Sequence, residues 1–221
     1  NMKHRYLFLV IPLFFIGFTF SDKKFSDPNK DKLLIEIVKY VVEKGHYNKI
    51  EINDGVSEKI FSSFINQFDS QKRFFLKSDI KNFEKYKFML DDQIKNYDLT
   101  FFNLVYETSK LRFEEIKKYY KEIIANPFDF NSKETLDLDF ENKDYSKNKN
   151  EVKQRWRKQL KFSTLDIALL KLGDSLDFID DRVYNESLAI VKKNTEDFFE
   201  FYKDMDRDDW FSSYINSFLN Q

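Results

Sequence analysis

Residues 46–87 read HYNKIEINDGVSEKIFSSFINQFDSQKRFFLKSDIKNFEKYK, and this stretch decides the class of fold. After Asn53-Asp54-Gly55, apolar residues recur at spacings of three and four: Ile60, Phe61, Phe64, Ile65 and Phe68. This period of 3.6 is typical of one face of an α-helix. Ser78 is expected to cap the next helix, because a serine hydroxyl accepts a hydrogen bond from an unpaired backbone amide. We expect that helix to carry Ile80, Phe83 and Tyr86 and to extend toward Leu90.

The same period continues on both sides of this stretch. Asp27-Pro28 is typical of a helix start, and Gly45 of a helix end. The longest helix is expected to open at Asp98-Leu99-Thr100 and to end at Asn126-Pro127, because the residue before proline avoids helical geometry. Further helices are expected from about residue 151, over about 180–203 and from about 208. Alternating strands and internal repeats are absent, so the sequence predicts an all-α, multi-helix, non-repeat domain with a polar loop near 131–150.

The first segment of the chain has the pattern of an export signal. Lys3, His4 and Arg5 precede an apolar run from Tyr6 to Phe20. Thr19-Phe20-Ser21 presents small residues at the positions that a signal peptidase reads, so cleavage is expected before Asp22. A short uncleaved anchor is the alternative, because a membrane-spanning helix needs about 20 apolar residues. We therefore divide the chain into a signal segment, 1–21, and a helical domain, 22–221, that works outside the cytoplasm.

Composition excludes several classes of function. The 37 basic and 38 acidic side chains nearly cancel, which argues against a nucleic-acid-binding protein. The absence of cysteine excludes disulfides, thiol nucleophiles and cysteine zinc sites. Only His4 and His46 are present, so a His-rich metal site and a Ser-His-Asp triad are nearly excluded. Four scattered glycines provide no phosphate-binding loop. We expect no cofactor and no metal.

The spacing Ser-x-x-Lys matches the pattern of a serine protease with a lysine base. Ser21 and Lys24 lie at the expected cleavage point, and Ser78 and Lys81 lie at an expected helix start. With so many lysines, chance matches are expected. His46, at a helix end, is interpreted as structural. The sequence therefore predicts no catalytic residue.

Other charged groups are also interpreted as structural. The acid pairs Asp91-Asp92, Asp180-Asp181 and Asp208-Asp209 lie at expected helix ends, where a carboxylate favours the helix dipole or meets water. Residues 143–161 carry eight Lys or Arg and Trp156. This stretch is either a site for an anionic polymer or an exposed helix face that Trp156 anchors to the core. We favour the second interpretation.

The 26 phenylalanines are unusually many. The neighbours Phe74-Phe75, Phe101-Phe102 and Phe198-Phe199 cannot all face one narrow stripe, because adjacent side chains diverge around a helix. Some must pack against a second layer or against another domain. Either phenylalanine replaces leucine in an ordinary core, or the domain has apolar surface that a partner covers.

Several of these residues resemble, in order and spacing, the N-terminal helical domain of tail-specific proteases. These are the periplasmic carboxyl-terminal processing peptidases of the S41 serine protease family. The resemblance covers about residues 30–221, and 46–79 is its specific part. It rests on these residues: His46-Tyr47, Asp54, Ser57, Ile60-Phe61, Phe68-Asp69, Phe74-Phe75-Leu76, Ser78-Asp79, Phe83, Arg112-Phe113, Pro127-Phe128-Asp129-Phe130, Trp156, Lys161-Phe162, Glu196-Asp197-Phe198-Phe199 and Asp208-Asp209-Trp210-Phe211.

The resemblance implies a role without chemistry for this chain. In the family, a PDZ domain and a protease domain with a Ser/Lys dyad follow this region, which makes the full-length relative a serine endopeptidase that cleaves C-terminal tails. We expect both domains to be absent here, so this chain alone is expected to be inactive. The resemblance implies a helical scaffold that limits substrate access, packs on those domains and docks an adaptor lipoprotein. Unstructured protein C-termini are the implied substrates, and the periplasm the implied compartment.

Two other hypotheses stay open at this point. The chain is alternatively a free-standing exported adaptor or inhibitor module that binds a protein partner. A sequence that continues past Gln221 into the next module favours the protease domain, whereas a stop codon there favours the free module. The third hypothesis is a binder of surface polymers that uses residues 143–161, and it requires binding that weakens steeply with salt.

Overall fold

A computed structural model describes residues 28–40, 53–173 and 178–219 of the chain, and these residues form helices and loops. The helices are α1 (Pro28–Tyr40), α2 (Asp54–Asp69), α3 (Lys77–Phe83), the short 3-10 helix η2 (Glu84–Tyr86), α4 (Leu90–Lys95), α5 (Thr100–Ile124), α6 (Lys149–Leu172), α7 (Asp181–Asp204) and α8 (Arg207–Leu219). In the described residues, the only strand-like feature is an isolated bridge between Leu76 and Ser146. The predicted all-α class is therefore confirmed.

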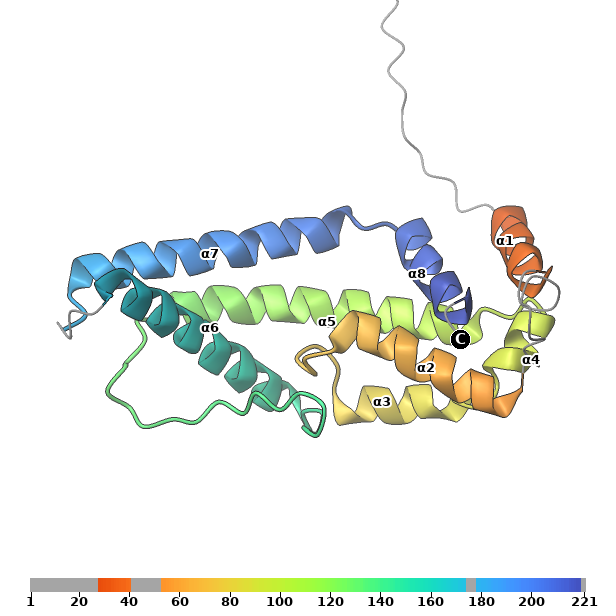
Figure 1. Ribbon diagram of the computed structural model, residues 1–221, viewed down its shortest axis with the longest axis horizontal. Helices are drawn as coiled ribbons and strands as arrows, with labels where there is room; N and C mark the ends of the chain where they lie inside the picture. Colours follow the sequence, from red (N-terminus) through yellow and green to blue (C-terminus); the bar gives the residue numbers. More distant parts are fainter. Residues whose placement is uncertain (1–27, 41–52, 174–177, 220–221) are drawn as a thin grey trace, which may run out of the picture.

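The long helix α5 forms the axis of the molecule (Figure 1). Helices α2, α3, α4 and α8 gather around its N-terminal half, whereas α6 and α7 lie along its C-terminal half. Each half has its own apolar core. None of the helices in the described ranges combines the length and the apolar character needed to cross a membrane.

The two cores are rich in aromatic side chains, and α5 contributes to both. Buried members of the first core include Ile60, Phe64, Phe75, Phe83, Leu90, Phe101, Phe102, Val105, Phe211 and Tyr214. Buried members of the second include Phe74, Phe113, Ile116, Tyr120, Trp156, Leu160, Val191 and Phe199. Because α5 connects these two sets, its stability depends on packing at both ends of the molecule.

The neighbours Phe101 and Phe102 are both fully buried. The ring of Phe101 lies 5.5 Å from that of Phe61 on α2, whereas the ring of Phe102 lies 5.2 Å from that of Phe211 on α8. Phe64 of α2 and Tyr214 of α8 each contact both rings, so these two helices together bury the adjacent pair. The expectation of a second packing layer is confirmed here, and no partner is needed to cover this pair.

The start of α3 differs from the sequence prediction. Ser78 is exposed, and α3 begins one residue earlier, at Lys77. Leu76 rather than Ser78 is the N-cap residue of α3, and the carboxylate of Asp79, at the third position of the helix, accepts the Leu76 backbone N–H at 2.8 Å. The expected extension toward Leu90 is also wrong, because η2 interrupts the helix and Leu90 begins α4. Residues 41–52 lie outside the described part, and with them the expected stop at Gly45.

A buried polar clamp joins α2 to α4. The Ser57 hydroxyl donates to the Asp91 carboxylate at 2.8 Å and accepts the Asp91 backbone N–H at 2.9 Å. Lys95 donates to the other carboxylate oxygen at 3.0 Å. Burial alone would raise the pKa of Asp91, but the hydrogen bonds from Lys95 and Ser57 outweigh it and lower that pKa.

We expect Ser57→Ala to lower the free energy of unfolding by about 1–3 kcal/mol at pH 7, because it leaves a buried carboxylate and amide short of a partner. A lowered folded-state pKa stabilises the fold above the ordinary pKa of 3.8, and this stabilisation is lost as the pH falls through the folded value. The difference between wild type and Ser57→Ala should therefore shrink below about pH 4.

Urea titrations at several pH values measure this effect. Ser62→Ala is the matched control, because Ser62 is exposed on the same helix. An equal loss of stability in both variants, or a difference that does not change with pH, would contradict the clamp.

Candidate functional site

The residues that the sequence analysis weighed for catalysis do not come together. Ser21, Lys24 and His46 lie outside the described residues. Ser78 and Lys81 are both exposed on α3, open to solvent. A lysine that acts as a general base needs a site shielded from water, and this surface provides none. Within the described ranges, no group of three or more His, Cys, Asp or Glu is placed to hold a metal ion.

The three acid pairs have separate structural roles. The Asp180 carboxylate caps α7 by accepting the Val183 N–H at 2.7 Å, and Asp208 pairs with Lys30 at 2.5 Å. Asp209 accepts the Asp206 N–H at 2.9 Å at the start of α8. Asp91 lies in the first turn of α4, as predicted, but it is 5% exposed. The interpretation as a solvated carboxylate is wrong for Asp91, because Ser57 and Lys95 replace the water.

The basic stretch 143–161 is largely occupied by contacts within the domain. Lys149 pairs with Glu115, Lys153 with Glu122 and Arg157 with Glu134. Trp156 is 3% exposed, and its indole N–H donates to the Arg73 carbonyl at 2.9 Å, which confirms it as the anchor.

The face is not wholly exposed, however. Lys161 is 8% exposed, and its ammonium donates to the Ser132 hydroxyl at 2.6 Å. This contact ties α6 to the loop between α5 and α6, so the interpretation as a simple exposed face is wrong for Lys161.

The chain between α2 and α3 is held by Asp69, which is 1% exposed. Its carboxylate accepts the backbone N–H groups of Arg73, Phe74 and Phe75 at 2.6, 2.9 and 2.9 Å. Burial raises the pKa of Asp69, although the three amide donors oppose that effect. The carboxylate thereby supplies the acceptors that neither a helix nor a sheet provides for this segment.

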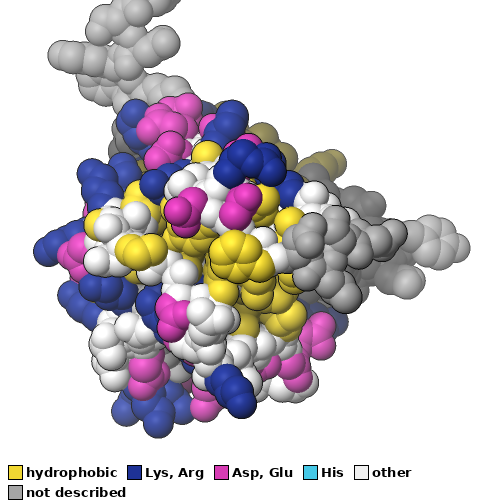
Figure 2. All heavy atoms as spheres, turned by 90° about the vertical axis from the view of Figure 1, so that its left-hand side faces the viewer, with side chains coloured by type: hydrophobic (Ala, Val, Ile, Leu, Met, Phe, Trp, Pro, Cys, Tyr) yellow, Lys and Arg dark blue, Asp and Glu magenta, His cyan; other side chains and the backbone are white. Residues whose placement is uncertain are grey.

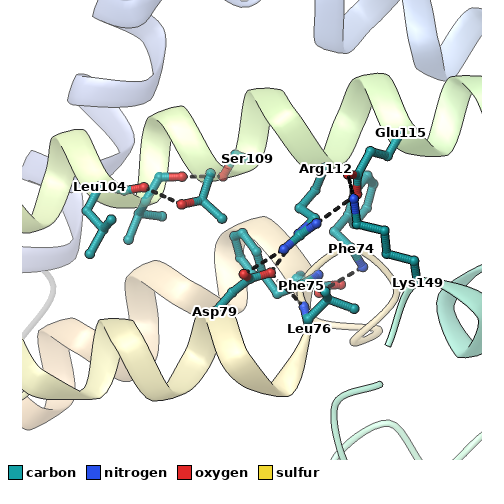
Figure 3. Close-up of polar contacts among 12 residues, drawn as sticks. Phe74, Phe75, Leu76, Asp79, Leu104, Ser109, Arg112, Glu115 and Lys149 are labelled. Carbon is teal, nitrogen blue, oxygen red and sulfur yellow. Dashed lines mark hydrogen bonds and ion pairs between the residues drawn. The ribbon is translucent and has the colours of Figure 1, made fainter. Parts of the chain in front are cut away.

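A second buried carboxylate connects this segment to α5. Arg112 on α5 reaches toward Asp79 on α3 (Figure 3) and donates to its two oxygens from Nε and Nη2 at 2.7 and 2.8 Å. Its Nη1 donates to Glu115 at 2.7 Å, and Lys149 contacts the same carboxylate. The hydrogen bond to Asp79 raises the pKa of Arg112 above its ordinary value. The pair is a two-point, charge-assisted contact between helices.

Sequence reasoning did not assign these roles, although a signal was present. Val105, Ser109, Arg112 and Ile116 follow a spacing of four, three and four, so Arg112 lies on the apolar stripe of α5. A charged residue on such a stripe predicts a buried partner of opposite charge. The identity of that partner, Asp79, depends on the tertiary fold.

The main exposed apolar feature lies at the end of the molecule where α5 and α6 finish and α7 begins. We name it the end face and define it by the apolar residues that line a hollow of about 580 Å³: Pro127, Phe128, Phe130, Phe178, Ile179 and Tyr184. The polar residues Asp129, Asn131, Asp181 and Asn185 line the same hollow. Phe178 is 84% exposed, and the nearby Leu170 on α6 is 75% exposed. Figure 2 looks at this end and shows apolar side chains gathered over its middle, with charged side chains around them.

Replacing Arg112 with methionine is expected to lower the free energy of unfolding by about 3–5 kcal/mol, because it leaves the buried charge of Asp79 without a partner. Adding Asp79→Asn should cost less than the sum of the two single changes, because the second change removes that charge. Lys110→Met on an exposed position of α5 is the control. Urea unfolding of the four proteins provides the cycle, and strictly additive losses would show that the two groups are not coupled.

Comparison with known proteins agrees with this structure. Residues 37–221 match the family described as the tail specific protease N-terminal domain. A protein named tail-specific protease from Haemophilus influenzae is 28% identical over 168 residues, which are 74% of this chain and 24% of that protein. The chain thus spans about a quarter of the length of this relative. Because the family match extends over most of the chain, the chain belongs to the family of tail-specific protease N-terminal domains.

Proposed function

We propose that this domain is the non-catalytic helical scaffold of an exported carboxyl-terminal processing serine protease. In that role it limits access of substrates to the protease core and provides docking surface. Family membership and the name of the Haemophilus relative support this role. The proposed partners are the PDZ and protease domains of the same polypeptide, an adaptor lipoprotein and, as substrates, unstructured protein C-termini. The proposed compartment is the periplasm, reached through the signal segment 1–21.

The use of buried polar groups supports a scaffold rather than an enzyme. The hydroxyls of Ser109, Thr164 and Ser187 each donate to a carbonyl one turn earlier in their own helix. The buried hydroxyl of Ser57 is held by Asp91. A nucleophile needs a base within reach and an open side from which the substrate approaches. These buried hydroxyls are instead engaged in holding the fold.

The end face is the structural feature that supports the proposed docking role. It combines exposed rings with a hollow large enough to accept side chains of a partner. The hydroxyl of Tyr184 accepts the Phe128 N–H at 2.9 Å, and the ring of Phe130 lies 5.7 Å from that of Tyr184. The walls are therefore held in place before a partner arrives, which lowers the entropic cost of binding.

The purified chain is expected not to hydrolyse a peptide with an apolar C-terminal tail. Ser78 and Lys81 are exposed, and the Ser132 hydroxyl that Lys161 contacts donates its proton to the Asp129 carbonyl rather than to that lysine. The Ser57 hydroxyl, bonded to Asp91, is buried. Mass spectrometry of the peptide after prolonged incubation measures this. A preparation of the chain with Ser78→Ala is the control for contaminating protease. Cleavage that occurs with the wild-type chain and disappears with Ser78→Ala would overturn the non-catalytic assignment.

Phe178→Asp is expected to weaken binding of the chain to a PDZ–protease fragment of a tail-specific protease by at least about tenfold, because it removes the exposed aromatic ring of the end face. Phe201→Asp is the matched control, since Phe201 is 62% exposed on α7 outside the lining of the end face. Biolayer interferometry with immobilised fragment compares the two. If both substitutions weaken binding equally, the end face is not the docking surface.

A further inference from the structure

An apolar stripe runs along the side of α1 that faces away from the rest of the domain. Its members are Leu33, Ile37 and Tyr40, which are 57%, 49% and 68% exposed. Their spacing of four and three residues places them on one face of the helix. We name this feature the outer stripe. It lies at the end of the molecule opposite the end face, where α1 packs against α4 and α8 (Figure 1).

The opposite side of α1 attaches the helix to the domain. Asp31, Ile35 and Val38 are at most 7% exposed. Each lies two residues before a member of the outer stripe, which is about 200° around the helix. The Asp31 carboxylate pairs with Arg207 of α8 at 2.8 Å, and Ile35 and Val38 belong to the first core. Apolar groups on two opposite sides of one helix indicate that a second apolar partner covers the outer stripe.

The sequence before α1 indicates which partner this is. The apolar run 6–20, the expected export signal, enters a membrane during export. Residues 21–27 connect this run to Pro28. A fully extended chain spans at most about 3.6 Å per residue, so the start of α1 is held within about 30 Å of the run. As long as the run is attached, α1 is therefore kept close to the surface of a bilayer.

We propose that the outer stripe lies in the headgroup region of a phospholipid bilayer while the run 6–20 is attached. A helix at such a surface buries its apolar side chains at the boundary between headgroups and acyl chains. Leucine and isoleucine suit the apolar side of this boundary, and the tyrosine ring, with its polar hydroxyl, suits the boundary itself. The contact leaves the end face, at the opposite end of the molecule, available for a protein partner.

The exposed charges of α1 do not oppose such a contact. The helix carries Lys30, Lys32 and Lys39 and one exposed carboxylate, Glu36. Lys30 also pairs with Asp208 of α8 at 2.5 Å. The balance of these five groups is slightly positive, which suits anionic headgroups. Because the excess is only one charge, the contact depends mainly on the apolar side chains.

A second copy of the chain suits the outer stripe less well. A stable interface between proteins involves about 20–30 residues on each side, and the stripe offers three. A bilayer needs no complementary shape, and the run 6–20 keeps it close, which raises its effective concentration. A short apolar stripe is therefore sufficient for a tethered contact with lipid, but not for a stable contact with a free partner.

Quenching of fluorescence by brominated lipid tests the proposal on the 221-residue chain bound to vesicles that contain anionic phospholipid. Tyr40→Trp places a tryptophan on the outer stripe, whereas the native Trp156 and Trp210 are buried. Bromine on the acyl chains near the headgroup should lower the fluorescence of the added tryptophan by about twofold or more, relative to unbrominated lipid. Leu170→Trp is the matched control, because Leu170 is 75% exposed at the opposite end of the molecule. Its fluorescence should not change.

A second set of variants separates the outer stripe from the run 6–20. Leu33→Gln and Ile37→Gln, added together to Tyr40→Trp, should reduce the quenching by at least about half, because they remove the other two apolar side chains of the stripe. Leu111→Gln in the same background is the control, since Leu111 is 56% exposed on α5. Circular dichroism checks that the variants remain folded, and flotation checks that each still binds the vesicles.

Equal quenching in Tyr40→Trp and Leu170→Trp, or quenching that the two glutamine substitutions leave unchanged, would overturn the proposal. Failure of the full chain to float with vesicles would overturn it as well. Sedimentation velocity without lipid examines the other occupant. Self-association that is lost with Leu33→Gln and Ile37→Gln would assign the outer stripe to a second copy of the chain instead.

Discussion

The fold depends on satisfying the backbone amides of residues 73–76, which lie in neither helix nor sheet. Asp69 accepts three of these N–H groups and Asp79 accepts the fourth, so two buried carboxylates replace the hydrogen bonds of regular structure. Burying two carboxylates is costly unless each is fully bonded. Arg112 offsets the cost at Asp79, whereas Asp69 relies mainly on the amides. Removing either carboxylate would leave buried donors without acceptors.

This short segment also connects the two cores. Phe74 packs in the second core and Phe75 in the first, although they are adjacent in sequence. Arg112 lies on α5 between Val105 of the first core and Phe113 of the second. The salt bridge from Arg112 to Asp79 therefore holds α3 against α5 at the boundary between the two cores.

The periodic spacing of apolar residues alone predicted most of the helices, because the side chains that each helix buries form an apolar stripe along it. The starts of α2 and α7 could also be predicted from the sequence, since the side chains of Asn53 and Asp180 cap these helices through local hydrogen bonds. The start of α3 was misassigned to Ser78. The Asp79 carboxylate bonds the Leu76 N–H and also pairs with Arg112 on α5, and the sequence alone does not reveal this tertiary contact. The hydrogen bonds from Arg155 and Trp156 to the carbonyls of Lys72 and Arg73 could not be predicted from the sequence, because they form only when α6 packs beside the segment after α2.

The near-zero net charge conceals an uneven distribution of charge. Along α6, Lys149 and Lys153 face glutamates of α5, and these pairs hold the two helices together. Arg155 lies on another side of α6, and its guanidinium donates hydrogen bonds to backbone carbonyls rather than to carboxylates.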